Sequence, residues 1–164
     1  MKPHFKRYSP LAALILLLAL LNITKFSVHA NFSITEIKAV AELSFPDNDG
    51  KPSDWIEITN TSDSSASLEG YFLTNNANDL KRWQFPAVNL SKGGSIIVFA
   101  SAKNRINPAE PLHASFTLDR KGDYLALIAP DGLSVVSGFD EGYPEQYPGS
   151  SYGYGTSGLV NREV

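Results

Sequence analysis

The sequence predicts an all-β fold, a β-sandwich or barrel of about eight or nine short strands. Short apolar runs, rich in β-branched and aromatic residues, recur along the chain after residue 30. Glycine, proline, asparagine, aspartate and serine separate these runs at intervals of roughly 8–14 residues, which is typical of strands joined by turns. No stretch after residue 30 shows a convincing helical period, so we expect little or no helix.

Eight segments are expected to form strands, in chain order. They are residues 34–40, 55–59, 71–74, 82–85, 95–100, 115–118, 124–129 and 134–139. Alternation is clearest in 55–59, where Trp55 lies on one face and Ile56 and Ile58 on the other, whereas in 34–40 the apolar side is blurred. Residues 130–132, Pro-Asp-Gly, predict a hairpin turn. A single helical turn is conceivable only in 102–109.

Residues 1–30 have the features of a secretory signal peptide. Lys2, Lys6 and Arg7 precede an unbroken apolar run over 11–21, and Val28-His29-Ala30 predicts cleavage after Ala30. The alternative is a retained signal anchor, which needs ~18–20 apolar residues to cross a bilayer. The run is shorter than that, so we expect a protein that is secreted, periplasmic or at the cell surface, without a stable membrane span after cleavage.

Charge and composition exclude several partners. The formal net charge is −3, and removing residues 1–30 takes away four basic and no acidic residues, which leaves −7. This sign argues against binding to nucleic acid or to anionic lipid, both of which attract basic surfaces. The chain has no cysteine, so an exported domain must be stabilised by its apolar core. Asn31, Asn60 and Asn89 begin glycosylation sequons, which matter only in a eukaryotic secretory pathway.

An ordered series of motifs resembles the lamin-tail domain in its bacterial, exported form. The motifs are DWIEITN (54–60), LEGYFLT (68–74), WQFP (83–86), GSIIVFAS (94–101), LHASFTL (112–118) and GDYLAL (122–127). The resemblance covers about 33–154 and implies an immunoglobulin-like β-sandwich that serves as an accessory module. Bacterial members often accompany hydrolase or surface domains, and the same fold in nuclear lamins binds proteins and DNA.

The resemblance and the composition divide the chain into three parts. Residues 1–30 are the signal peptide, 31–140 the lamin-tail-like domain, and 141–164 an irregular extension rich in glycine, tyrosine and proline. Residues 153–158 match G-x-G-x-x-G, but we reject a dinucleotide site because neither a preceding strand nor a following helix is expected. The tyrosines of this extension, Tyr143, Tyr147, Tyr152 and Tyr154, either pack on the domain or form an adhesive surface.

An acidic turn is the only candidate metal site. Asp47, Asp49 and Asp54 could gather oxygen ligands around Ca²⁺, which prefers six to eight of them. The spacing does not fit an EF-hand, because taking Gly50 as its invariant glycine puts Ile56 at the position of the bidentate glutamate. The alternative is an aspartate- and asparagine-rich turn without a metal. No other cofactor is expected.

Candidate catalytic groups are few. His113 is the only histidine after residue 30, so a zinc site with two or more histidines is impossible within one chain. A serine–histidine–aspartate triad needs only one histidine, but there is no nucleophile-elbow motif, and a structural role for His113 is favoured. Trp55 and Trp83 are expected to fill the core, and an exposed indole would instead indicate carbohydrate or peptide stacking.

These observations favour a non-catalytic, exported module for binding or structural attachment. Its partner would be a protein or a surface glycan, and the chain would be a monomer or part of a longer protein. Two alternatives remain open at this point. The chain could be the N-terminal fragment of a larger secreted hydrolase or surface protein, or a small calcium-assisted hydrolase with carboxylates placed ~5–10 Å apart around a cleft.

Overall fold

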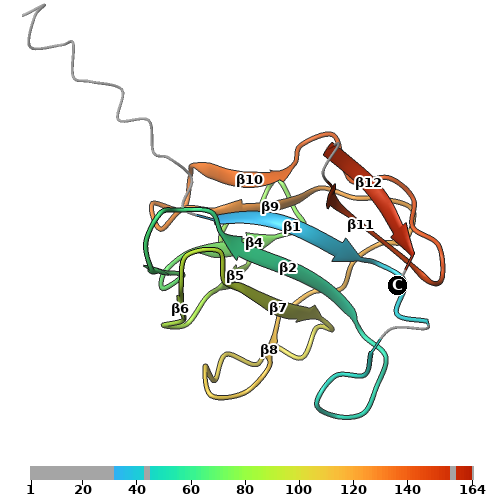
Figure 1. Ribbon diagram of the computed structural model, residues 1–164, viewed down its shortest axis with the longest axis horizontal. Coiled ribbons are helices and arrows are strands. Elements are labelled where there is room, and N and C mark those ends of the chain that lie inside the picture. The colour runs from blue at the N-terminus through green and yellow to red at the C-terminus, as the bar shows by residue number, and fades with distance from the viewer. Residues whose placement is uncertain (1–31, 43–44, 156–157, 164) are drawn as a thin grey trace, which may run out of the picture.

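The computed structural model describes residues 32–42, 45–155 and 158–163, and it is an all-β sandwich (Figure 1). The predicted signal peptide and its cleavage site lie outside these residues. Twelve strands are present among the described residues: β1 (Phe32–Lys38), β2 (Asp54–Asn60), β3 (Ala66–Ser67), β4 (Phe72–Thr74), β5 (Trp83–Gln84), β6 (Asn89–Leu90), β7 (Ser95–Ala100), β8 (Leu112–His113), β9 (Leu125–Ile128), β10 (Val135–Phe139), β11 (Ser150–Gly155) and β12 (Gly158–Glu163). The described part contains no helix, and thus none that could span a membrane.

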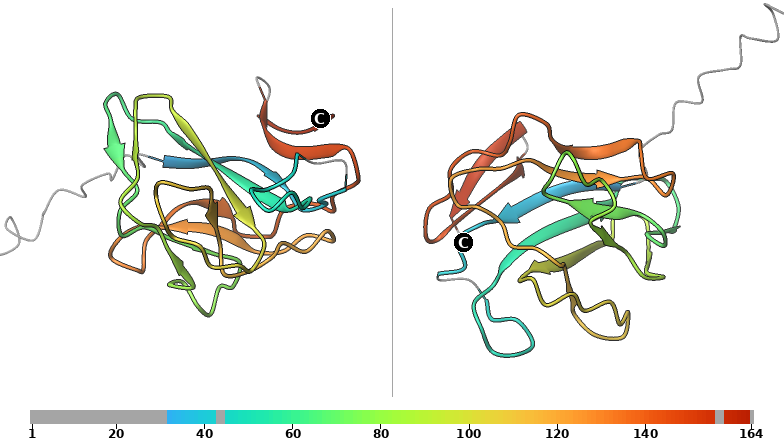
Figure 2. Two further views of the ribbon diagram at one scale, coloured as in Figure 1. Left: turned by 90° about the horizontal axis from the view of Figure 1, so that it is seen from below. Right: turned by 180° about the vertical axis from the view of Figure 1, so that it is seen from behind.

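The strands form two large sheets and one short pair. The first sheet has the order β12-β11-β1-β2-β7-β8, the second β10-β9-β4-β5, and β3 pairs with β6. All pairings are antiparallel except that of β7 with β8. Figure 2 shows the two large sheets as two layers facing each other. The immunoglobulin-like β-sandwich predicted from the sequence is therefore confirmed.

The core lies between these layers and is built from alternate residues of each strand. Ile37, Ile56 and Val98 face one another across β1, β2 and β7, and all three are fully buried. Leu73 and Leu127 pair in the opposite sheet and are also fully buried. Each buried aliphatic side chain contributes about 1.5–3 kcal/mol, so this core can stabilise the domain without a disulfide.

A β-bulge in β1 explains why the alternation of residues 34–40 is blurred. The register against β2 shifts between Ile34 and Glu36, so Thr35 is the extra residue. Ile34 and Ile37 then both face the core although they are three residues apart. The observed strand begins at Phe32 and ends at Lys38.

The prediction of a strand at 115–118 is wrong. Only Leu112 and His113 form a strand there, and Thr117 makes no more than an isolated bridge with Ser101. Segment 115–118 lies beside the end of β7, where the Ala102 N–H donates to the Phe116 carbonyl, but the positive φ of 59° at Ala102 turns the chain away and prevents a regular ladder.

The C-terminal segment 141–164, expected to be irregular, contains the hairpin of β11 and β12. Strand β11 adds to the edge of β1, where Glu36 lies opposite Gly153 and Ile37 opposite Tyr152. A Cβ atom at Gly153 would lie 2.4 Å from the carbonyl oxygen of Thr35, so this glycine allows close strand contact. The expectation of an irregular tail was wrong because its glycine-rich composition conceals the strand pattern.

Candidate functional site

Two long loops, residues 45–53 and 101–111, leave the same end of the six-stranded sheet and lie side by side (Figure 1). The first leads into β2 and the second connects β7 to β8. Ion pairs and hydrogen bonds join them, and we call them the latched loops. They bring together residues more than fifty positions apart in the sequence.

Asp47 is the central acceptor of the latched loops. Its buried carboxylate accepts hydrogen bonds from the backbone N–H of Asp49 (2.9 Å) and Lys51 (3.1 Å) and from the Ser53 hydroxyl (2.8 Å). It also forms an ion pair with the Lys103 ammonium group of the second loop. Burial by itself would raise the pKa of Asp47, but the bonds from Lys103, Ser53 and the backbone hold it well below its ordinary value.

Asp49 makes the second connection between the loops. The Arg105 guanidinium donates to both of its oxygens, at 2.9 and 2.8 Å, and Lys103 Nζ lies 2.7 Å from Oδ2. These bonds, with that from Arg105 the strongest, lower the pKa of Asp49 to about 2. In return the pKa values of Lys103 and Arg105 are raised. The two carboxylates are therefore neutralised by side chains of the chain itself.

His113 holds the latched loops to the sheet. Its buried ring stacks on Phe99, and its two nitrogens lie 2.7 Å from the Ser101 hydroxyl and 2.8 Å from Asn48 Oδ1. The Asn48 oxygen can only accept, so Nε2 carries the proton and Nδ1 accepts from Ser101. Burial lowers the pKa of His113, which favours the neutral ring. His113 is a structural histidine, and sequence reasoning missed its partner Asn48 because 65 positions separate them.

Aromatic side chains on the outer face of the six-stranded sheet pack against the first of the latched loops. Trp55 lies opposite Lys38 and Phe99, and Phe99 lies opposite His113, on the outer face of the six-stranded sheet. Phe45 from the first loop covers these side chains, with ring centroids 5.7 Å from Trp55 and 5.9 Å from Phe99. The sequence predicted that Trp55 fills the core, but this is wrong: Trp55 is buried on the outer face of the sheet beneath the first loop, because Phe45 covers it there.

Trp83 and the tyrosines of the C-terminal extension, which the sequence suggested as core or surface residues, lie in both kinds of environment. Trp83 is 2% exposed and belongs to the core cluster, as predicted. Tyr143 is buried, and its hydroxyl accepts from the backbone N–H of Asp119 and donates to its carbonyl. Tyr152 packs against Phe139, whereas Tyr147 is exposed. The side chain of Tyr154 lies outside the described residues.

The structure does not bring the three predicted metal ligands together. Asp47 and Asp49 bind Lys103 and Arg105, whereas the Asp54 carboxyl group accepts hydrogen bonds from the backbone. Across residues 32–42, 45–155 and 158–163, no three histidine, cysteine, aspartate or glutamate side chains form a group able to hold a metal ion.

We expect Ca²⁺ to leave the stability of the domain unchanged. The ammonium and guanidinium groups already provide the positive charge that Asp47 and Asp49 require. Thermal unfolding of residues 31–164 in millimolar Ca²⁺ and in chelator should therefore give the same melting temperature. A ligand that binds only the folded state at a hundred times its Kd adds ~2.7 kcal/mol, so a calcium site would give a clear rise.

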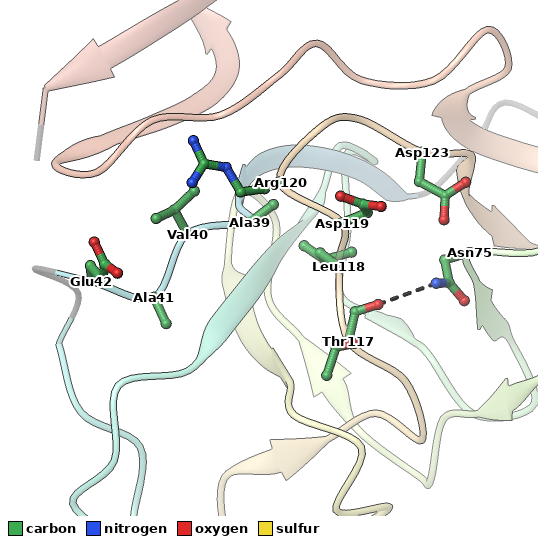
Figure 3. A pocket seen from close by; sticks show the side chains of 10 residues that line it. All are labelled: Ala39, Val40, Ala41, Glu42, Asn75, Thr117, Leu118, Asp119, Arg120 and Asp123. Carbon is green, nitrogen blue, oxygen red and sulfur yellow. Dashed lines mark hydrogen bonds between the residues drawn. The ribbon is translucent and has the colours of Figure 1, made fainter.

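Two adjoining hollows lie between the segment that follows β1, residues 39–42, and the segment 117–120. The larger, of about 590 Å³, is shown in Figure 3, and the smaller has about 250 Å³. The larger hollow is lined by Ala39, Val40, Ala41, Glu42, Asn75, Thr117, Leu118, Asp119, Arg120 and Asp123. The smaller is lined by Ala41, Lys51, Pro52, Ser53, Asp54, Ala100, Ser101, Lys103 and Thr117. Because Ala41 and Thr117 line both, the two hollows adjoin, and we refer to them together as the groove.

Asp54 connects the two walls of this groove. Its carboxyl group accepts hydrogen bonds from the backbone N–H groups of Leu118 on one wall and Ala41 on the other. Burial raises the pKa of Asp54 to about 6, and these two bonds reduce the shift only in part. Sequence reasoning chose Asp54 as a metal ligand, whereas its observed contacts are with the backbone.

The raised pKa of Asp54 predicts that stability falls with rising pH. The folded state binds this proton more tightly than the unfolded state, so the stabilisation is complete below about pH 4 and is lost as pH rises through about 6. Relative to Asp54→Asn, the wild type should lose about 2 kcal/mol between pH 4 and 7, after a discount for partial exposure. Urea unfolding of both proteins across this range checks the prediction, and a pH-independent difference would contradict it.

Comparison with known proteins identifies the family. A search of curated proteins found no match. The family model for the Lamin Tail Domain matches residues 28–139, more than half of the chain. This region includes β1 to β10 and both latched loops. The chain therefore belongs to the Lamin Tail Domain family, a family of non-enzymatic immunoglobulin-like domains.

Proposed function

We propose that this protein is a non-catalytic, exported module that binds a protein partner through the end of the sandwich formed by the latched loops. The observation that carries this proposal is the internal pairing of the loops. Asp47 and Asp49 bind Lys103 and Arg105, and Asn48 binds His113. Loops that are ordered before a partner arrives lose less conformational entropy on binding, which favours recognition.

Exposed apolar side chains beside the charged bonds support a protein partner. Phe45 is 44% exposed on the first loop, and Ile106 is 54% exposed on the second. An apolar contact surrounded by polar groups is the usual composition of a protein interface. Export is supported by the signal-peptide features of residues 1–30.

The polar groups most suited to catalysis are already engaged. Both ring nitrogens of His113 are hydrogen-bonded and its ring is buried, so in this arrangement it has no access to a substrate. This favours a binding role over the alternative of a small hydrolase.

The test compares loop variants with matched variants elsewhere. The exported protein is first analysed by intact mass, and loss of residues 1–30 is expected. Photo-crosslinking to cell-surface proteins of the native host is then quantified for wild type, Phe45→Ala/Ile106→Ala and Leu133→Ala/Val135→Ala. The last pair is also exposed and apolar, but lies on the β9–β10 hairpin and the start of β10.

We expect the loop variant to lose at least tenfold in crosslinking to a defined partner and the control to retain it. Equal crosslinking by all three proteins would exclude the latched loops as the recognition surface. Turnover of ester, glycoside or phosphate substrates by the purified domain would overturn the non-catalytic assignment.

A further inference from the structure

Lys38, the last residue of β1, is buried without an acceptor for its amine. Its side chain is fully buried, and its Nζ has no hydrogen-bond partner among the described residues. Trp55 lies opposite Lys38 on β2, and an indole offers a donor but no acceptor. Burial lowers the pKa of Lys38, and the negative charge of Glu36 opposes this shift only in part. Because a buried amine that lacks an acceptor is unfavourable, the surroundings of Lys38 cost the domain stability.

Strand β11 forms one wall around Lys38, at the C-terminal end of β1 (Figure 1). The register pairs Ile37 with Tyr152, and carried one residue further it sets Ser151 opposite Lys38. Ser151 is also fully buried, but its hydroxyl donates to the carboxylate of Glu36. Departure of β11 would therefore open this side of Lys38 to water.

The pairing of β11 with β1 is short. It includes Glu36 and Ile37, whereas β2 pairs with β7 over all of 54–59. Nearer the start of β1, the backbone N–H of Ile34 donates to the Ser137 hydroxyl of β10, at 3.0 Å, and not to β11. A short ladder at a sheet edge opens more readily than a long one, because fewer hydrogen bonds must break.

The core lies almost entirely in the chain before β11. The described members of the buried core cluster run from Phe32 to Tyr143. Among the described side chains of β11, the half-buried Tyr152 is the one that packs against this cluster, where its ring contacts Phe139. The region matched by the family model also ends at residue 139, before β11. Removal of β11 therefore leaves the core between the two layers in place.

We propose that β11 is a detachable edge strand, which leaves β1 together with the hairpin that it begins while β1 to β10 stay folded, and that the Lys38 amine favours this release. The amine is buried in the attached form and hydrated in the released form. Release also leaves the backbone groups of Glu36 and Ile37 unpaired at the edge of the six-stranded sheet, where another strand can pair with them. This inference goes beyond the proposed binding function and does not depend on it.

Amide hydrogen exchange, measured by NMR on the protein lacking residues 1–30, tests the release directly. We expect the hydrogen-bonded amides of β11 to exchange at least about a hundredfold faster than those of β2 and β7. Their exchange should also respond little to low concentrations of urea, because local release exposes little surface. The same rate and the same urea dependence in β11, β2 and β7 would overturn the proposal.

Lys38→Met tests the role of the amine, because methionine has a similar length and no charge. The substitution should slow the exchange of the β11 amides by about tenfold or more, since the amine is buried only in the attached form. Lys51→Met is the matched control, because Lys51 is exposed, and it should change this exchange less than about twofold. Unchanged or faster exchange of β11 in Lys38→Met would show that the amine does not favour release.

Gly153→Ala tests the release from the opposite direction. A Cβ atom at this position would lie 2.4 Å from the carbonyl oxygen of Thr35, so attached β11 would have to shift. We expect the β11 amides to exchange at least about tenfold faster, while β2 and β7 keep most of their protection. Loss of protection in all three strands together would mean that β11 is an integral part of the fold.

Thermal unfolding verifies that each variant folds. If Lys38→Met failed to fold, the amine would be stabilising in the native structure and its assigned role would be wrong. The wild type and Gly153→Ala would still decide whether β11 detaches.

Discussion

Replacing Asn60 with alanine is expected to destabilise the domain by about 3 kcal/mol and to lower its melting temperature by roughly 10 °C. Asn60 ends β2, is fully buried, and lies opposite Phe32 of β1. Its Nδ2 lies 2.8 Å from the carbonyl oxygen of Ser64 and 3.0 Å from those of Leu90 and Ser91. Alanine removes the donors for these carbonyls and leaves a cavity as well.

The other half of the amide is equally engaged. Asn60 Oδ1 accepts from the backbone N–H of Ser62 at 3.0 Å and from its hydroxyl at 2.7 Å. This explains why the sequon at Asn60 is not a free acceptor site in the folded domain. The amide joins the turn after β2 to the end of β6, so its loss acts on two connections at once.

Asn89→Ala is the matched control, because Asn89 also begins a sequon but its side chain is exposed on β6. We expect this substitution to change the free energy of unfolding by less than about 0.5 kcal/mol. Both variants are compared by urea unfolding and by thermal melts at pH 7. Similar losses in the two variants would contradict the assigned role of Asn60.

Replacing Asp47 with alanine is expected to cost about 2 kcal/mol, because the latched loops lose their central acceptor. The Ser53 hydroxyl, the Lys103 ammonium group and two backbone N–H groups all donate to this buried carboxylate. Lys103 is partly exposed and recovers some hydration, which keeps the loss below that of a fully buried ion pair. The measurement is urea unfolding at pH 7.

A control variant and a double-mutant cycle separate the contribution of the Asp47–Lys103 ion pair from that of the hydrogen bonds from Ser53 and the backbone. Asp63→Ala breaks an ion pair with Lys92 on the surface and is the control, which we expect to change stability very little. A double-mutant cycle of Asp47→Ala and Lys103→Ala should show a coupling energy above about 0.5 kcal/mol. Additive effects at Asp47 and Lys103 would mean that Asp47 acts only through Ser53 and the backbone.

The pH profile of the whole domain follows from opposing shifts. Asp47 and Asp49 have pKa values below their ordinary range, so their stabilisation is present above about pH 4 and is lost as pH falls further. Asp54 acts in the opposite sense between pH 4 and 6. Burial lowers the pKa of His113 below its ordinary value of about 6.5, so its contribution to stability rises with pH up to that value and opposes that of Asp54.

Local patterns in the sequence determined the fold class and most of the strands. Alternation in residues 55–59 places Ile56 and Ile58 in the core, and this holds because strand side chains point to opposite faces with a period of two. The hairpin turn at 130–132 was predictable because glycine at position 132 has a positive φ of 71° and Asp131 accepts hydrogen bonds from the turn. Such features depend on neighbours in the chain.

Contacts between distant segments decided the site. Asp47 and Asp49 form an acidic turn in the sequence, and only the fold brings Lys103 and Arg105 against them. Asp54 has a raised pKa because the chain near Ala41 and Leu118 closes around it. Neither arrangement leaves a pattern in one segment, since each depends on how two loops meet.

The strand register was also decided by tertiary structure. The bulge at Thr35 and the addition of β11 to the edge of β1 both depend on pairing between strands, and composition carries no record of that pairing. The sequence by itself therefore determined that the fold is an all-β sandwich and that alternate apolar residues such as Ile56 and Ile58 face its core. Tertiary structure decided which polar groups are neutralised, which are buried, and where a groove remains open, because charge and burial are properties of surroundings that the folded chain creates.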